Sequence, residues 1–213
     1  MPTWLLTLTP ALATPPVGHL RPVAATPSLI ARFVRHQTEL GRPEAFPVCR
    51  PLPVPELKLC FRVWEGDRRR WVTELDRLRW GVTAEILQSR IESNCVESVK
   101  RAVVRTVQGG TSRYLALTDG DGWAVMGLLC PKALAARLRT LSPATSFKAA
   151  LPTEHVLLAW SDGNPELDRI LAVGVREIHQ TEPDPLTPQV LSFDGERWHP
   201  YGRAVPVAAH PTQ

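Results

Sequence analysis

The sequence lacks any long uninterrupted hydrophobic run. None of its apolar stretches reaches the ~18–20 residues that a membrane-spanning helix requires. The opening stretch, MPTWLLTLTPALAT, contains an Ala-Leu-Ala that resembles a cleavage site, but it carries no early positive charge and Pro10 interrupts it. We therefore expect no membrane partner and no cleaved signal peptide.

Cysteine is scarce, and its spacing matches no zinc or redox motif. The four positions, none of which forms a CxxC pair, are Cys49, Cys60, Cys95 and Cys130. Cys60 and Cys130 lie in apolar runs, which is typical of buried thiols that pack as small hydrophobic groups. A chain of 213 residues can build a core without disulfide cross-links. The sequence thus predicts reduced cysteines and a cytoplasmic protein.

Motifs of catalysis and metal binding are also missing. The six histidines form no HxH or HExxH pattern, and no serine sits in a GxSxG turn. The stretch TDGDGW places Asp119 and Asp121 two residues apart, but no further acid follows before Glu154, so a calcium loop would lack ligands. We expect these aspartates to form a turn, and we expect no catalytic residue, metal or cofactor.

Lysine is scarce as well. It occurs only four times, so arginine supplies nearly all of the positive charge behind a net charge of +4. Acids surround the densest basic run, residues 68–70, within a few positions: Glu65, Asp67, Glu74 and Asp76. Because dedicated nucleic-acid binders concentrate basic residues on one face, such binding is not favoured.

Proline, in contrast, is abundant, with 21 residues, and much of the excess over an ordinary share lies at 10–27 and 51–55. Proline lacks an amide donor and disfavours helix in the residue before it. We expect an extended N-terminal segment over 1–27, a domain over 28–203 and a frayed tail over 204–213. A division of the domain into two subdomains near 96–110 stays open.

Apolar spacing predicts the regular elements of this domain. Helical spacing, with capping residues, predicts helices at 28–40, 84–94, 131–141 and from 165 onward. Alternation and turn residues predict strands, most of them in hairpins, at these positions: 57–64 with 71–73, 98–108, 113–118 with 123–129, 147–152 with 155–162, and 189–201. The expected fold class is α+β, with a mixed, mostly antiparallel sheet built from hairpins and three or four packed helices.

Four segments in a fixed order resemble the YtpQ-like family of bacterial proteins of unknown function. They are RWGVTAEILQSRIESN, TDGDGWAVMGLLCPKAL, FKAALPTEHVLLAWSDGN and PLTPQVLSFDGERWHPY, and the resemblance covers about 47–201. Arg90 and His155 depart from the family pattern. The resemblance implies an intracellular α+β domain and implies no reaction.

These observations favour a soluble, non-enzymatic protein that binds another macromolecule, with protein preferred over nucleic acid. Arginine next to tryptophan is enriched at protein interfaces. The candidate interaction residues are therefore Arg69, Arg70, Trp71, Trp123, Arg197 and Trp198. The oligomeric state is left open.

Two alternatives remain at this point. The first is a hydrolase-type enzyme with a site near Glu154, His155 and Asp162. The second is a weak nucleic-acid binder that uses Arg68–Arg70, Arg101 and Arg105.

Overall fold

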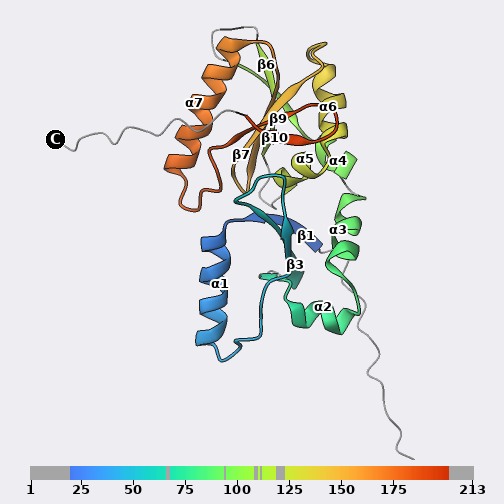
Figure 1. Ribbon diagram of the computed structural model, residues 1–213, viewed down its shortest axis with the longest axis vertical. Coiled ribbons are helices and arrows are strands. Elements are labelled where there is room, and N and C mark those ends of the chain that lie inside the picture. Colours follow the sequence, from blue (N-terminus) through green and yellow to red (C-terminus); the bar gives the residue numbers. More distant parts are fainter. Residues whose placement is uncertain are drawn as a thin grey trace, which may run out of the picture.

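The computed structural model describes residues 20–65, 68–93, 95–107, 110, 112–118 and 123–201. These residues form two antiparallel sheets stacked along the long axis of the molecule, with helices around them (Figure 1). The elements are β1 (Leu20–Ala25), α1 (Pro27–Glu39), β2 (Cys49–Pro51), β3 (Lys58–Glu65), β4 (Arg68–Trp71), α2 (Glu74–Trp80), α3 (Ala84–Glu92), α4 (Cys95–Lys100), β5 (Val103–Thr106), β6 (Arg113–Thr118), η2 (Trp123–Val125), α5 (Met126–Leu129), α6 (Pro131–Arg139), β7 (Phe147–Thr153), β8 (Val156–Ser161), α7 (Pro165–Thr181), β9 (Val190–Phe193) and β10 (Trp198–Pro200).

The first sheet is organised around β3, which pairs with β1 on one side and with β2 and β4 on the other. The alternation read from the sequence holds: Leu59, Phe61 and Val63 are buried in the main core. Cys60 points to the opposite face, where Leu29 and Ile30 of α1 pack against it. Helix α1 therefore covers one face of this sheet, while the other face belongs to the main core.

The expectation of free thiols was wrong. Cys49 and Cys60 lie directly opposite each other on β2 and β3 and form a disulfide. Cys130 is disulfide-bonded as well, and the described residues contain no free cysteine. The eleven-residue separation of Cys49 and Cys60 gives no sequence signal, because only the strand register brings the two side chains together.

Part of the predicted N-terminal extension belongs to the sheet. Residues 20–25 form β1, which pairs with β3 over six residues. Pro22 is tolerated there because β1 is an edge strand, where an amide donor can be dispensed with. Thr26 then caps α1 by accepting a hydrogen bond from the Leu29 amide, and Pro27 opens the helix. Residues 1–19 and 202–213 lie outside the described part of the chain.

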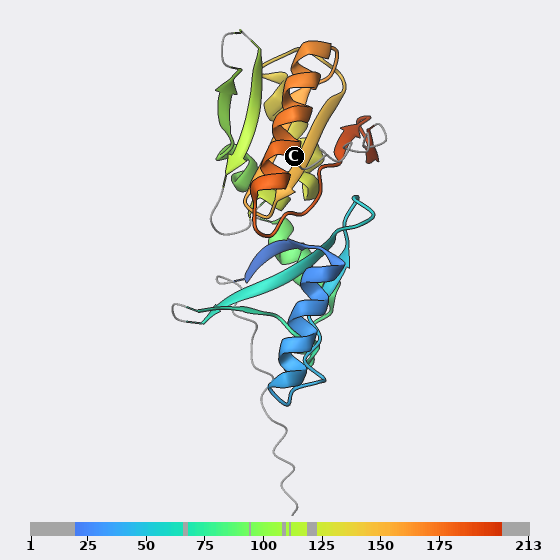
Figure 2. The same ribbon diagram turned by 90° about the vertical axis from the view of Figure 1, so that its left-hand side faces the viewer.

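The second sheet has the strand order β10-β9-β7-β8-β6-β5 and is covered on both faces. Helix α7 packs on one face through Leu167, Leu171 and Val175, which contact a cluster that includes Trp160. Helices α4, α5 and α6 lie on the opposite side of the sheet (Figures 1 and 2). This double cover explains the uniformly apolar sequence of β8.

Two strand predictions were wrong. Residues 123–129 form η2 and α5 instead of a hairpin arm, and β6 pairs with β5 and β8. A short, wholly apolar run fits a buried helix as well as a strand, and Pro131 starts α6 directly after it. A Cβ atom on Gly127 would lie 3.0 Å from a Leu157 methyl group, so α5 packs tightly on β8. The predicted strand 98–108 is divided between α4 and β5.

One continuous core joins the two sheets. It contains Leu59 and Phe61 from the first sheet together with Leu117 and Leu157 from the second. A half-buried ion pair, Arg62 Nη1 to Glu154 Oε2 at 3.1 Å, links β3 to the β7–β8 turn.

The α+β class and the antiparallel sheets are confirmed. Helices α1, α3, α6 and α7 correspond to the four predicted helices. The short helices α2, α4 and α5 were not predicted, because each is too brief to establish an apolar period.

Replacing both Cys49 and Cys60 by alanine should lower the free energy of unfolding by about 2–4 kcal/mol, since the bridge limits the freedom of the unfolded chain. Denaturant unfolding under oxidising conditions measures the contribution of this bridge to stability, because the disulfide of Cys130 stays intact under those conditions. An unchanged midpoint in the doubly substituted protein would contradict a stabilising role for the bridge.

Candidate functional site: a cleft between α1 and α2

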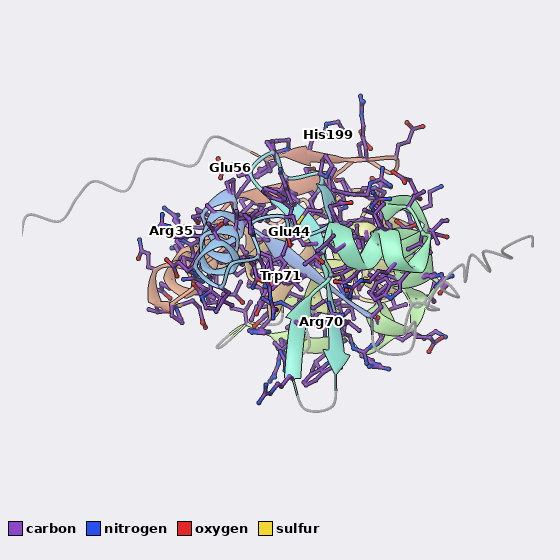
Figure 3. The ribbon with its side chains drawn as sticks, turned by 90° about the horizontal axis from the view of Figure 1, so that it is seen from below. Arg35, Glu44, Glu56, Arg70, Trp71 and His199 are labelled. Carbon is purple, nitrogen blue, oxygen red and sulfur yellow. A yellow bond between two sulfur atoms is a disulfide. The ribbon has the colours of Figure 1, made fainter. Side chains whose placement is uncertain are left out.

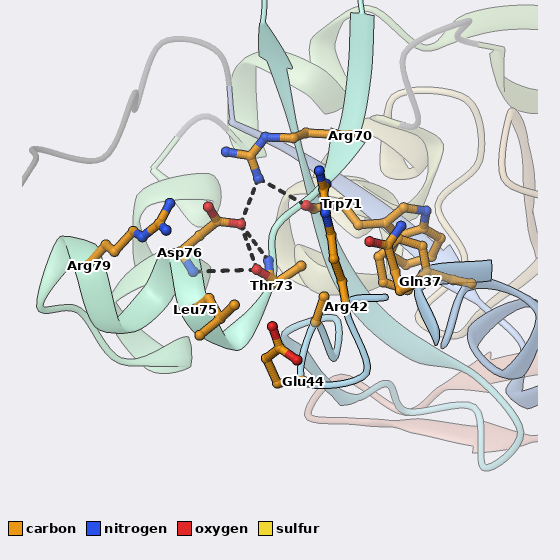
Figure 4. Close-up of a pocket in the computed structure, with 11 residues that line it drawn as sticks. Gln37, Arg42, Glu44, Arg70, Trp71, Thr73, Leu75, Asp76 and Arg79 are labelled. Atoms are coloured by element: carbon orange, nitrogen blue, oxygen red, sulfur yellow. Dashed lines mark hydrogen bonds and ion pairs between the residues drawn. The ribbon is translucent and has the colours of Figure 1, made fainter. Parts of the chain in front are cut away.

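A cleft of about 660 Å³ opens beside β4, between α1 and α2. Its walls come from α1, from the loop that follows α1, from β4 and from α2 (Figure 4). We call it the α1–α2 cleft, and its lining residues are Phe33, Gln37, Arg42, Glu44, Ala45, Arg70, Trp71, Thr73, Leu75, Asp76 and Arg79. Arg70 and Trp71 are the two predicted interaction residues that belong to it.

Two aromatic rings form the apolar part of the cleft. Trp71 and Phe33 lie with their ring centroids 5.4 Å apart. The Arg62 guanidinium lies over the indole of Trp71, 5.0 Å from its centroid, because the two residues are direct partners in the β3–β4 ladder. Trp71 is thus fixed by its neighbours while part of its surface stays open to the cleft.

A hydrogen-bonded network fixes the polar part. Thr73 caps α2, and Asp76 in the first turn accepts hydrogen bonds from the Thr73 amide and hydroxyl, each at 2.9 Å. Arg70 Nη1 donates to the same Asp76 oxygen at 2.6 Å. Burial alone would raise the pKa of Asp76, but the hydrogen bonds from Arg70 and Thr73 outweigh it and hold the pKa below its usual value.

Two further guanidinium groups enter the cleft without a partner. Within the described part of the chain, neither the Arg42 side chain nor the Arg79 side chain has a hydrogen-bond or ion-pair partner. In Figure 4 the Arg79 guanidinium lies near Asp76, and the Arg42 guanidinium lies on the other side of Asp76, beside Trp71. Glu44 is the second acid of the lining, so the cleft holds three arginines and two carboxylates. One of these carboxylates, Asp76, already accepts a hydrogen bond from Arg70.

Exposed apolar side chains continue from this cleft. Leu75 lies in the lining and is 37% exposed, and Leu78 follows it one helical turn later at 60%. Phe46 is 52% exposed, and its carbonyl accepts a hydrogen bond from the Glu74 amide at the start of α2. We call Phe46, Leu75 and Leu78 the apolar rim.

The remaining predicted interaction residues lie elsewhere. Arg69 is on β4, with its guanidinium over the ring of Trp64 at 4.5 Å. Arg197 is exposed in the turn between β9 and β10. Trp198 is buried, packs against Phe193 and donates from its indole N–H to the Leu128 carbonyl at 2.9 Å, so it is a core residue and its candidacy is corrected. Trp123 begins η2, and its side chain lies outside the described part, as do Asp119 and Asp121.

The three residues of the hydrolase alternative do not converge. Glu154 and His155 contact each other at 3.3 Å in the β7–β8 turn, where Glu154 also pairs with Arg62. Asp162 follows the other end of β8, which is roughly 20 Å away at about 3.4 Å per strand residue. Among the described residues there is no group of three or more His, Cys, Asp or Glu side chains that could hold a metal ion.

Asp162 belongs instead to a buried charge cluster around Lys148 on β7. The Lys148 ammonium is 2.8 Å from Asp162 and 2.5 Å from Asp168 of α7, and it lies 3.7 Å from the centroid of the Tyr201 ring. Trp160 donates its indole N–H to the second oxygen of Asp168 at 2.6 Å. The polar groups of this cluster bond to one another, and the Lys148 side chain is only 1% exposed. Because Lys148 is on β7 and Asp168 is on α7, their ion pair joins the strand to the helix.

The pKa values of the cluster follow from these contacts. Burial would lower the pKa of Lys148, but its hydrogen bonds to Asp162 and Asp168 outweigh burial and raise it. The hydrogen bond from Lys148 is the main cause that lowers the pKa of Asp162. Both groups are therefore charged across the neutral range.

Comparisons with family models, with curated proteins and with solved structures found no match. The YtpQ-like resemblance of 47–201 gains no support from them. No helix in the described ranges is long and apolar enough to cross a membrane.

Sequence reasoning missed most of the cleft. Phe33 and Gln37 come from α1, Arg42 and Glu44 from the following loop, and Arg79 from α2. The spacing Thr73-x-x-Asp76 is the one signal that could have been used, because a carboxylate three residues after a threonine favours a helix cap. No local pattern indicates that the other residues share a surface.

Substituting Lys148 by methionine should lower the free energy of unfolding by about 3–5 kcal/mol, because it leaves two carboxylates without their buried partner. Denaturant unfolding near pH 7 measures the loss. A change below about 1 kcal/mol, like that expected of an exposed pair such as Arg32–Asp184, would contradict the buried ion pair.

The same cluster sets a pH dependence. Folding lowers the pKa of the Asp162 carboxyl below its unfolded value of 3.8, so the charged carboxylate stabilises the folded state above that pH. This stabilisation is lost as the pH falls through the lower pKa of the folded state. The difference in unfolding free energy between wild type and Asp162→Asn should thus be constant above about pH 5 and shrink below pH 4.

Proposed function

We propose that the protein acts by binding another protein, without catalysing a reaction, and that the α1–α2 cleft is the binding site. The partner segment would offer a carboxylate beside apolar side chains. The carboxylate would pair with Arg42 and Arg79, and the apolar groups would cover Trp71 and the apolar rim. The observation that carries the proposal is the pair of unpartnered guanidinium groups next to a half-buried tryptophan.

The composition of the cleft supports a protein partner. Arginine and tryptophan are the residue types that most often dominate binding energy at protein interfaces. Trp71 is held by Phe33 and Arg62 before any partner arrives, so little side-chain freedom is lost on binding. The exposed leucines at 75 and 78 add apolar area that a partner can cover.

A nucleic acid fits this surface less well. Glu44 and Asp76 would face phosphate groups, and phosphate binding needs a basic face that acids do not interrupt. Arg105 lies on β5 of the second sheet and Arg101 lies in the turn before β5, so neither extends the cleft. The separation of Glu154 from Asp162 likewise weakens the hydrolase alternative.

The cytoplasmic location expected from the sequence depended on free thiols. Disulfides persist in oxidising compartments and are rare in the cytosol. We therefore propose that the chain functions outside the reducing cytosol. Membership of the YtpQ-like family is also a proposal, supported by the order of four sequence segments.

The cleft is tested by reversing its two unpartnered charges. The double variant Arg42→Glu, Arg79→Glu should bind the captured partner at least tenfold more weakly than wild type, a change of about 1.4 kcal/mol. The partner is first identified by cross-linking and mass spectrometry from the native host, then purified and titrated by calorimetry.

The matched control is Arg35→Glu, Arg176→Glu, which reverses two exposed charges elsewhere. Figure 3 shows Arg35 on the side of α1 that faces away from Trp71. Equal losses in the two double variants would reject the cleft. If the protein bound a labelled DNA or RNA oligonucleotide with an affinity that fell steeply as salt increased, the nucleic-acid alternative would be favoured instead.

The location is tested by thiol labelling of the protein taken directly from its host. Quenching with a thiol-reactive mass tag should leave the cysteines unlabelled until a reductant is added. Complete labelling before reduction would contradict an oxidising compartment.

A further inference from the structure

Strand β5 forms an open edge of the second sheet. It is the last strand in the order β10-β9-β7-β8-β6-β5, and among the described residues no strand pairs with its outer side. All four of its residues are exposed, including Val103 at 46% and Val104 at 37%. In Figure 2 the β5–β6 hairpin lies at the far end of the molecule from α1. This surface is therefore separate from the α1–α2 cleft.

The ladder fixes which backbone groups of β5 point outward. The Val107 amide donates to the Ser112 carbonyl at 3.0 Å, and the same register continues along the hairpin. Because bonded and non-bonded pairs alternate in antiparallel strands, Val103 and Arg105 direct their N–H and C=O groups toward β6. Val104 and Thr106 direct theirs to the open edge.

The side chains of β5 alternate as well. Arg105 is opposite Tyr114, which packs in the cluster below α7, so Arg105 and Val103 lie on the α7 side of the sheet. Val104 is opposite Leu115 of the main core and lies on the other side. A strand added to this edge would meet a guanidinium on one face and a valine on the other.

The charge of this edge is of one sign. Residues 101–107 and 112–118 contain three arginines and no acid. Arg101, Arg105 and Arg113 have no ion-pair partner in the ranges that the structure describes. A second copy of the chain would bring the same arginines to the edge, and like charges across a ladder are destabilising.

We propose that the β5 edge takes up an extended segment of a partner protein in which acidic and apolar residues alternate. The segment adds one strand to the sheet, with its backbone bonded to Val104 and Thr106. Its acidic side chains face Arg105, and its apolar side chains cover Val104. Main-chain bonds supply affinity in this mode and the alternating side chains supply specificity. The inference goes beyond the proposed function, since it assigns a second surface.

The test uses fluorescein-labelled peptides and fluorescence polarisation. The full-length protein should bind the peptide TEVEVET at least tenfold more tightly than TKVKVKT or the proline-interrupted TEVPVET. The variant Arg105→Glu should reverse the preference between TEVEVET and TKVKVKT. The variant Val104→Pro removes an outward N–H without removing a bond to β6, and it should weaken TEVEVET binding at least tenfold.

Hydrogen exchange by NMR supplies a readout on the backbone itself. Saturating TEVEVET should slow exchange of the Val104 and Thr106 amides at least tenfold and leave the Val103 and Arg105 amides, which already bond to β6, unchanged. The variant Arg42→Glu, Arg79→Glu should bind TEVEVET like wild type, so failure of the cleft and failure of the edge are distinguishable.

Several results would overturn the inference. They are equal binding of TEVEVET and TEVPVET, unchanged binding by Arg105→Glu, and loss of TEVEVET binding in the cleft variant. Self-association of the protein through β5, detected by sedimentation and abolished by Val104→Pro, would replace the proposed segment by a second copy.

Discussion

Strand β3 is the constraint on which the first sheet depends. It is paired along both edges, with β1 on one side and with β2 and β4 on the other, and its side chains meet packed atoms on both faces. A shift of one residue would exchange its faces, which would place Arg62 in the main core and separate Cys60 from Cys49. Hydrophobic pattern and disulfide therefore specify the same register, and the bridge makes that register covalent.

The chemistry of the α1–α2 cleft follows from this register. Pairing of Arg62 with Trp71 places the guanidinium against the indole ring. The chain then leaves β4 within two residues, so Thr73 caps α2 and brings Asp76 back to Arg70. Strand pairing and helix capping together engage Asp76, one of the two carboxylates of the cleft, and Arg42 and Arg79 remain available to an anionic partner.

Local sequence predicted elements whose signals are local. The alternation of 57–64, the caps at Thr83 and Asn164, and Pro131 at the first turn of α6 all match the structure. The run 123–129 could not be assigned by pattern, because an apolar stretch of that length has no period to read.

The disulfide and the cleft were beyond such reasoning for a different reason. Cys49 meets Cys60, and Phe33 meets Trp71, only through tertiary placement. Arg70 and Trp71 were predicted because an arginine directly precedes a tryptophan. Arg197 and Trp198 show the same pattern, yet Trp198 is a core residue. Neighbouring residues in the sequence thus indicate what a side chain can do, and burial decides whether it is free to do it.

The bridge between Cys49 and Cys60 has one more consequence, for degradation. The residues between them run through a proline-rich loop whose outer positions, Pro53, Pro55 and Glu56, face solvent. Exposed loops are where proteases cut first. A single cut in this loop would leave both halves of the chain covalently joined at the sheet, so a nicked molecule would gain one water in mass and stay a single covalent unit with its core until the bridge was reduced.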